Sequence, residues 1–319
     1  MNKPSVVIVS PALQDANNGN WQTAKRWEQM LSKHYRIRIL KEWDGDASDN
    51  CMLALHARRS AGSIAAWHAR HGSRGLILAL TGTDLYRDID SDTSAQQSLD
   101  SARHLIVLQE LGIQQLPKKH HAKTVTIFQS TGTRKTLPKT AKHLNAVMVG
   151  HLRDEKMPQT LFEAARILKD EKHIHITHIG AGLDEALAQD AINTEAICAR
   201  YTWARGLKHA QTLARIQRAH ILVHTSKMEG GAHVLMEAVC SGTPVLASRM
   251  DGNVGMLGAN YAGYFPVGDA QALAALLRRC KNEPAFLDEL ATQCALRAPL
   301  FSPANESANL NKLVAQALL

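Results

Sequence analysis

Short apolar runs alternate with longer amphipathic stretches along most of this 319-residue chain. After the first run, residues 21–35 place apolar side chains three or four positions apart, which is the spacing of a helix. The runs themselves are short enough to be buried strands. Strands are predicted at residues 6–10, 36–41, 52–57, 76–80, 105–109, 125–129, 146–150, 174–179, 221–225 and 244–247.

The alternation is interrupted once, at residues 131–143. This segment is rich in Thr, Lys and Pro and has no period, so it is predicted to be a linker. Strand–helix alternation on both sides predicts an α/β protein of two doubly wound domains with mostly parallel sheets, at residues 1–135 and 145–302. The helical pattern of residues 303–319 is expected to pack back on the first domain. Ligands in such folds lie beyond the carboxyl ends of the strands, so a cleft between the domains is the expected site.

Composition restricts the environment and the ligand. No apolar run approaches the roughly 20 residues that span a bilayer, and the first run is too short for a signal peptide, so a cytoplasmic protein without a membrane partner is expected. The five cysteines are scattered, which predicts reduced, buried thiols. The net charge of +8 favours anionic partners. Aromatic residues make up only 5% and no basic stripe interleaves with them, so phosphorylated small molecules are favoured over nucleic acid.

Two patterns could be taken for a metal site. His173, His175 and His178 are close in sequence, but no carboxylate or thiol completes a ligand set, and they are interpreted as side chains on the faces of a strand. The D-x-D run of residues 88–92 precedes a predicted helix, where Asp92 is expected to act as the N-cap. No metal cofactor is therefore expected.

Two polar motifs follow predicted strands in the second half. Arg153 and Lys156 come shortly after Gly150 in a strand-to-helix loop, where two cations can neutralise a diphosphate. Solvated surface charges would give the same pattern. Gly180 and Gly182 follow the next strand, and such a pair can equally serve the geometry of a turn.

The most informative motif reads E-G-G-A-H-V-L-M-E over residues 229–237. Its small residues are predicted to open a helix whose amides and positive dipole end suit an anion. These small residues are Gly230, Gly231 and Ala232. Glu229 is placed to bind hydroxyls of a sugar, and Glu237, set among apolar neighbours, to accept both hydroxyls of a ribose. The alternative is that Glu229 is a cap and Glu237 an exposed helix residue.

Together with G-T-P at residues 242–244, these motifs resemble the donor signature of the GT-B glycosyltransferases, in the family 4-like group that includes glycogen and sucrose synthases. The likeness spans about residues 146–266. It implies that Arg153 and Lys156 hold the diphosphate of a sugar nucleotide and that Glu237 holds its ribose.

The same resemblance implies that Glu229 and the amides of Gly230 and Gly231 contact the sugar and phosphate, and that Arg153, Lys156 and Glu229 form the catalytic set. Met157 departs from the family pattern, which often has glycine after the lysine. This departure leaves the role of the lysine intact and is expected to narrow the pocket.

Polar segments also follow strands in the first half. In N-N-G-N at residues 17–20, Asn20 is expected to cap a helix, with Asn18 and Gly19 adding to an anion cradle, although a plain turn and cap would look the same. Two further segments are expected to open onto the same edge and to surround a small oxyanion. The residues of these segments that are expected to bind it are Arg58, Arg59, Thr81, Gly82, Thr83, Asp84 and Arg87. No apolar surface suited to a lipid acceptor is found there.

These segments closely resemble the selenosugar synthases of selenoneine biosynthesis. The matching pieces are residues 11–12, 16–21, 54–60, 80–89, 107–109 and 129–130. The resemblance implies that selenophosphate is the nucleophile and that the donor is a UDP-sugar such as UDP-N-acetylglucosamine or UDP-glucose. It also implies a 1-seleno-sugar product and, as partners, other enzymes of the selenoneine pathway.

Other functions remain open from the sequence. A glycosyltransferase with a hydroxyl or thiol acceptor would need a base near the anomeric carbon, for which His56 and Asp84 are candidates. A UDP-sugar epimerase would act without an acceptor, and a sensor of sugar nucleotides would bind UDP without turnover. Selenophosphate needs no strong base, because selenium is soft and already ionised near neutral pH.

Overall fold

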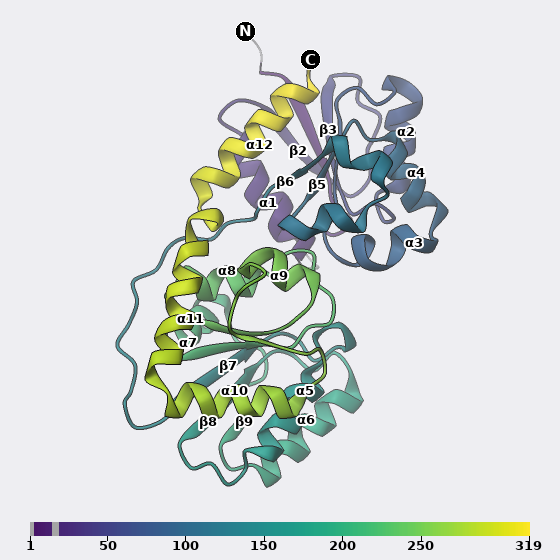
Figure 1. The fold of residues 1–319 in the computed structure, drawn as a ribbon. Coiled ribbons are helices and arrows are strands. Elements are labelled where there is room, and N and C mark those ends of the chain that lie inside the picture. The colour runs from purple at the N-terminus through teal and green to yellow at the C-terminus, as the bar shows by residue number, and fades with distance from the viewer. Residues whose placement is uncertain (1–2, 15–18) are drawn as a thin grey trace. The chain divides into compact units, whose positions relative to one another are not determined.

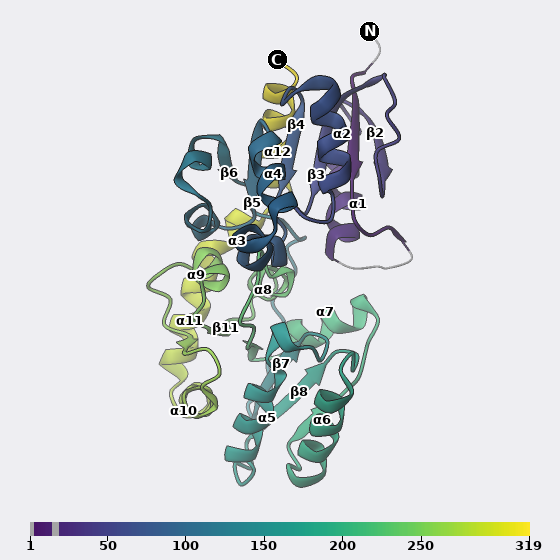
Figure 2. The same cartoon turned by 90° about the vertical axis from the view of Figure 1, so that its right-hand side faces the viewer.

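The computed structural model describes residues 3–14 and 19–319. The chain divides into two compact units, and Figures 1 and 2 show the elements of each. The first unit comprises Met1–Gln129, Glu229–Gly231 and Pro303–Leu319, and the second comprises Ser130–Met228 and Ala232–Ser302.

The first unit is built on a sheet of six parallel strands in the order β2-β1-β3-β4-β5-β6. The strands are β1 (Ser5–Val9), β2 (Arg36–Leu40), β3 (Asp49–Leu55), β4 (Leu76–Ala79), β5 (His104–Val107) and β6 (Thr124–Thr126). Because β3 and β4 are neighbours, with Leu55 paired to Ala79, the chain leaves both strands at the same edge of the sheet.

Helices cover both faces of this sheet (Figure 1). Alternate residues of β1 point to opposite faces: Val6 and Ile8 join the core under α1 (Gly19–Leu31) and α12 (Pro303–Ala317). Val7 and Val9 join the core under two other helices, α2 (Ala61–His71) and α4 (Thr93–Ser101). Short helices complete the unit: a π-helix η2 (Asp84–Asp88), α3 (Ile89–Ser91), and the 3-10 helices η3 (Glu110–Gln115) and η4 (Lys118–Lys123).

The last helix is tied to the first by a buried carboxylate. Glu306 of α12 is 1% exposed and accepts hydrogen bonds from Arg26 Nε at 3.0 Å and Trp27 Nε1 at 2.6 Å, both on α1. Leu310 and Val314 of α12 lie in the same apolar core as Trp27. Residues 303–317 therefore complete the first unit, although they come last in the chain.

The second unit also has six parallel strands, in the order β12-β11-β10-β7-β8-β9. They are β7 (Leu144–Val149), β8 (Ile174–Ile179), β9 (Tyr201–Trp203), β10 (Ile221–His224), β11 (Val245–Ser248) and β12 (Tyr264–Phe265). The helices are α5 (Pro158–Ile167), α6 (Glu185–Ile197), α7 (His209–Arg218), α8 (His233–Val239), α9 (Asp251–Leu257), α10 (Ala270–Asn282) and α11 (Pro284–Arg297), with the 3-10 helices η5 (Asp154–Lys156) and η6 (Ala298–Phe301).

Several predictions about elements are confirmed. The ten predicted strands are present, β8 with the predicted ends and the other nine with shifted ends, and residues 131–143 contain no helix or strand. Asp92 caps α4, accepting from the Ala95 amide at 2.9 Å. All five cysteines are free and buried.

No helix in the described part of the chain is long and apolar enough to cross a membrane.

One prediction of a helix start is wrong. Among the described residues α1 comprises Gly19–Leu31, so Asn20 is a helical residue and not the N-cap. Strands β9 and β12 were not predicted, because three and two residues are too few to show a period of two.

Candidate functional site

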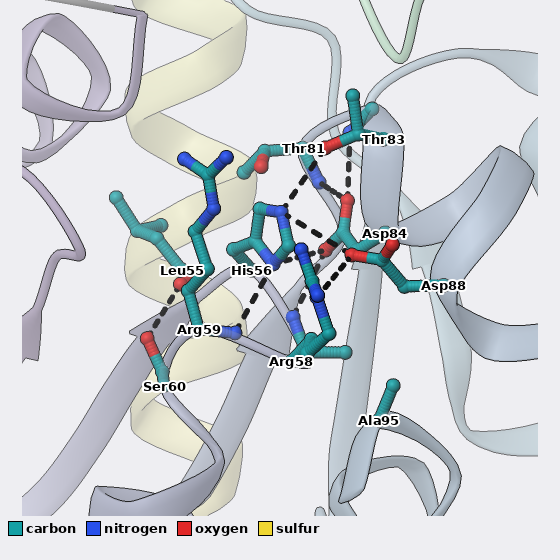
Figure 3. A network of polar contacts seen from close by, with 12 residues as sticks. Leu55, His56, Arg58, Arg59, Ser60, Thr81, Thr83, Asp84, Asp88 and Ala95 are labelled. Carbon is teal, nitrogen blue, oxygen red and sulfur yellow. Dashed lines mark hydrogen bonds and ion pairs between the residues drawn. The ribbon is translucent and has the colours of Figure 1, made fainter. Parts of the chain in front are cut away.

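The loops after β3 and β4 are joined by one buried carboxylate, that of Asp84 (Figure 3). Its Oδ1 accepts from the amides of Thr81 at 2.9 Å and Gly82 at 2.8 Å. Its Oδ2 accepts from the amide of Ala57 in the other loop at 3.0 Å. Asp84, predicted as a ligand contact, therefore has both oxygens engaged with backbone and acts as a framework residue of these loops.

Next to Asp84 lies His56, which is buried and has a left-handed backbone with φ of 74°. Its Nδ1 accepts from the amide of Arg59 at 3.3 Å, so the proton resides on Nε2, which contacts Thr83 Oγ1 at 3.1 Å. Burial lowers the pKa of His56 below its ordinary value, although the nearby Asp84 carboxylate raises it in part. The ring is therefore neutral, with both nitrogens engaged.

Two of the predicted arginines meet at a single carboxylate, that of Asp88 in η2. Arg58 Nε lies 3.0 Å from Asp88 Oδ2, and Arg87 Nε lies 3.3 Å from Asp88 Oδ1. Asp88 is buried, whereas the side chains of Arg58 and Arg87 are 42% and 50% exposed. Their terminal nitrogens have no partner in the part of the chain that the structure describes. The carboxylate thus holds two cations side by side with their donors turned to solvent.

The other residues predicted to bind the acceptor lie in the loop after β4, in α1 or outside the described residues. Thr81 and Thr83 are half-buried on either side of Gly82, whose φ of 145° is accessible mainly to glycine. Gly19 and Asn20 lie at the start of α1, after the strand that neighbours β3. Asn18 lies outside the described residues.

In the second unit, the glycines of the predicted donor motifs have a packing role. A Cβ on Gly180 would lie 1.9 Å from the carbonyl oxygen of Gly150, and a Cβ on Gly182 would lie 2.9 Å from Ala188 Cβ. The segments that follow β7 and β8 approach each other so closely that Gly180 cannot carry a side chain. This agrees with the alternative interpretation, in which the glycine pair serves the geometry of a turn. His178 of β8 lies next to this contact, with its Nε2 3.1 Å from the carbonyl oxygen of Gly150.

Arg153 is the N-cap of the 3-10 helix η5 after β7, and Lys156 is the last residue of that helix. Arg153 is half exposed, with Nε 3.9 Å from Glu155, and the aliphatic stem of Lys156 runs beside Gly150. Met157 follows in a left-handed conformation, φ 44° and ψ 53°, between η5 and α5. A glycine adopts this conformation without the steric cost of a Cβ, which accounts for the glycine that the family pattern often has at this position.

Helix α8 begins later than predicted. Its first residue is His233 and its N-cap is Ala232, so Gly230 and Gly231 precede the helix and do not open it. The segment Glu229–Gly231 is grouped with the first unit, whereas Ala232 and α8 belong to the second.

Glu237 is the buried carboxylate of α8, only 6% exposed. Its Oε1 lies 2.7 Å from His209 Nε2 and 3.2 Å from His233 Nδ1. Burial raises the pKa of Glu237, but the hydrogen bonds and charges of His233 and His209 outweigh burial, and the net pKa is lowered. Glu237 is therefore ionised. Because it is buried, the alternative interpretation of an exposed helix residue is wrong.

The two histidines were not singled out from the sequence. His233 could have been found, because it lies four residues before Glu237, and such pairs meet on a helix. His209 begins another helix, and no sequence spacing connects it to Glu237.

A cavity of about 1140 Å³ lies elsewhere in the first unit. It is lined at the amino ends of β1, β2 and β3 by Ser5, Arg36 and Asp49. Since ligands of such sheets bind at the carboxyl ends, this cavity is separate from the loops that hold Arg58 and Asp84.

Residues 129–299 match the family of glycosyl transferases group 1. A curated relative is the amylovoran biosynthesis glycosyltransferase AmsK of Erwinia amylovora, 32% identical over 174 residues. The match covers 51% of this chain and 42% of that protein, so the chain spans less than half of its length.

Solved structures show the same fold across nearly the whole chain. The sucrose-phosphate synthase of Thermosynechococcus elongatus aligns with a TM-score of 0.76 at 16% identity, covering 99% of both chains. HepE of Anabaena, solved in complex with UDP and glucose, aligns with a TM-score of 0.71 at 14% identity, again over 99% of both. The two six-stranded parallel sheets are the Rossmann-like domains of a GT-B fold. With more than half of its residues matching the family, this chain belongs to the glycosyl transferases group 1.

Proposed function

We propose that this protein transfers N-acetylglucosamine or glucose from a UDP-sugar to selenophosphate, giving a 1-seleno-sugar, UDP and phosphate within selenoneine biosynthesis. The observation that carries the proposal is the pairing of Arg58 and Arg87 on Asp88. Two guanidinium groups with outward donors suit a compact, multiply charged oxyanion. Family membership supports the transfer of a sugar.

The roles of the donor residues follow from the family resemblance. Arg153 and Lys156 neutralise the diphosphate, and Glu237 binds the ribose. The amides of Gly230 and Gly231, with Glu229, contact the phosphate and sugar. In this chain Glu237 is buried but ionised, which suits a carboxylate that accepts hydrogen bonds from hydroxyl groups.

In the proposed reaction, selenium attacks the anomeric carbon through an oxocarbenium-like state. A C–Se bond forms while the C–O bond to UDP breaks, and the electron pair leaves with the β-phosphate oxygen. The charge that develops there is stabilised by Arg153 and Lys156. Water then attacks phosphorus, the Se–P bond breaks, and phosphate and the seleno-sugar are released. These cations and a preionised nucleophile make a metal unnecessary, so we propose that turnover continues in EDTA.

The rival acceptors need a base, and the contacts of the candidates disfavour it. The ring nitrogens of His56 are engaged with Arg59 and Thr83. The Asp84 carboxylate accepts three backbone amides. Neither group is free to take a proton from a hydroxyl or thiol, whereas selenophosphate requires no such step.

The proposal is tested by measuring UDP release from UDP-N-acetylglucosamine and UDP-glucose with selenophosphate, thiophosphate or phosphate as acceptor. Selenophosphate is expected to be the best substrate. Arg58→Ala removes one charge-assisted contact and is expected to raise the KM for selenophosphate by roughly tenfold or more, with little change in KM for the UDP-sugar.

Asp90→Asn, an exposed neighbour in α3, serves as the control with unchanged KM. UDP release with simple alcohols or thiols but not with selenophosphate would contradict the proposed acceptor. Isomerisation of the UDP-sugar without any acceptor would identify an epimerase instead.

A further inference from the structure

Two imidazoles contact one oxygen of a buried carboxylate in the second unit. Glu237 Oε1 is 2.7 Å from His209 Nε2 and 3.2 Å from His233 Nδ1. His233 lies one turn before Glu237 on α8, and His209 is the first residue of α7, which packs against α8. Each ring must present an N–H at this contact, because the ionised carboxylate can only accept. The two imidazoles therefore use both lone pairs of Oε1.

The other oxygen of Glu237, Oε2, does not share these contacts. Oε2 has no partner among the residues that the structure describes, although the side chain as a whole is only 7% exposed. A carboxylate offers about four lone-pair positions, and the two that remain are both on Oε2. Among the described residues, Oε2 is not one of the fully buried polar atoms that lack a partner, so water can reach it, and a ligand that donates hydrogen bonds to Oε2 can take the place of that water.

We propose that His209 and His233 are positioning residues that orient Glu237 so that Oε2 alone receives the vicinal hydroxyls of the donor ribose. This inference rests on the proposed function, in which Glu237 binds the ribose of UDP. The imidazoles come from two different helices, so together they fix the rotation of the carboxylate more firmly than either helix alone. Neither imidazole needs to touch the ligand.

The proposal predicts how the protein discriminates between UDP and 2′-deoxy-UDP, measured by calorimetry on the full chain. The wild-type protein is expected to bind UDP roughly tenfold or more tightly than 2′-deoxy-UDP, because the lost hydroxyl bonds a charged acceptor. In His209→Ala and His233→Ala the carboxylate can rotate, and the ratio is expected to fall to about threefold or less. His173→Ala changes an exposed histidine that directly precedes β8, and this control variant is expected to keep the wild-type ratio.

Conservative variants separate positioning from structural damage. His209→Gln and His233→Asn place an amide N–H near the positions of Nε2 and Nδ1, and both are expected to restore the preference for UDP. Damage to α7 or α8 would weaken UDP and 2′-deoxy-UDP equally and leave their ratio unchanged. A ratio that stays at the wild-type value in both alanine variants would therefore overturn the proposal.

The outcomes also distinguish this inference from the function on which it rests. If the wild-type protein binds no UDP, the proposed donor is wrong and the inference with it. If Glu237→Gln abolishes the preference while both alanine variants keep it, Glu237 binds the ribose but the histidines do not position it. Only the inference is then wrong.

Discussion

Met157 occupies a backbone position that favours glycine. Its φ of 44° lies in the left-handed region, which costs a residue with a Cβ about 1–2 kcal/mol. We expect Met157→Gly to have a free energy of unfolding about 1 kcal/mol above that of Met157→Ala, since both lose the same side chain contacts and only glycine relieves the strain. Urea denaturation measures the difference. Equal stability of the two variants would contradict this account.

His178 makes the stability of the second unit depend on pH. Burial lowers the pKa of His178 from 6.5 to about 4, although the Gly150 carbonyl, which accepts from its Nε2–H, raises it in part. The unfolded chain binds this proton first, so the contribution is complete above pH 6.5 and is lost as the pH falls toward 4.

We therefore expect His178 to account for about 3 kcal/mol of the decrease in unfolding free energy between pH 7 and pH 4. In His178→Asn the decrease is expected to be smaller by that amount. Urea unfolding at a series of pH values measures both proteins. An identical pH dependence of wild type and variant would show that folding does not lower the pKa of His178.

Which single residues the sequence could identify depends on the range of their contacts. Arg58 and Arg87 are expected to converge because both follow predicted strands of a parallel sheet, and the structure brings them to one carboxylate. The carboxylate itself, Asp88, was read only as part of a D-x-D run. The contact of His209 with Glu237 joins residues 28 positions apart, and such tertiary contacts leave no local pattern.

At the scale of elements, Asp84 connects the chain after β3 to the chain after β4. Asp84→Asn keeps an oxygen for the amides of Thr81 and Gly82 but turns an NH₂ group toward the amide of Ala57. A buried N–H without an acceptor costs about 1–3 kcal/mol, so we expect roughly 2 kcal/mol of destabilisation in chemical denaturation. Asp90→Asn, which is exposed, is expected to change stability by much less. If Asp84→Asn were as stable as the wild-type protein, the hydrogen bonds of the Asp84 carboxylate would contribute little to the free energy of unfolding.

Element boundaries were less predictable than the elements. The start of α8 was placed at the glycines because two glycines after a strand resemble a helix opening, but the chain stays irregular until Ala232. Asn20 is predicted to be a cap because Asn is common at that position, yet both Gly19 and Asn20 are helical residues of α1. In both errors several adjacent polar or small residues could each precede the helix. Which of them does so depends on packing in the folded chain, and the local sequence does not show it.

For the whole molecule, the alternation of strand and helix patterns was sufficient to predict two parallel sheets. The position of each strand within its sheet was not predictable, because the period of a strand identifies its buried faces and not its neighbours. The order β12-β11-β10-β7-β8-β9 is a property of the folded chain. The match to the glycosyl transferases group 1 covers residues 129–299, the part of the chain that contains the predicted donor motifs.

Loss of one cation from the donor motifs is expected to slow sugar transfer. Arg153→Ala removes a positive charge proposed to stabilise the departing UDP, and we expect a loss of about 2–4 kcal/mol in transition-state stabilisation. This corresponds to roughly 30- to 1000-fold in kcat/KM, measured by UDP release. Arg200→Ala, an exposed arginine of the same unit, is the control. Turnover of Arg153→Ala near the wild-type rate would remove Arg153 from the catalytic set.

Mass spectrometry of the product formed from a UDP-sugar and selenophosphate tests the central claim most directly. The account predicts a hexose or N-acetylhexosamine that carries selenium at C1, together with UDP and phosphate. A product in which the sugar is joined to another acceptor, or a UDP-sugar that is unchanged or isomerised with no selenium in any sugar, would contradict it.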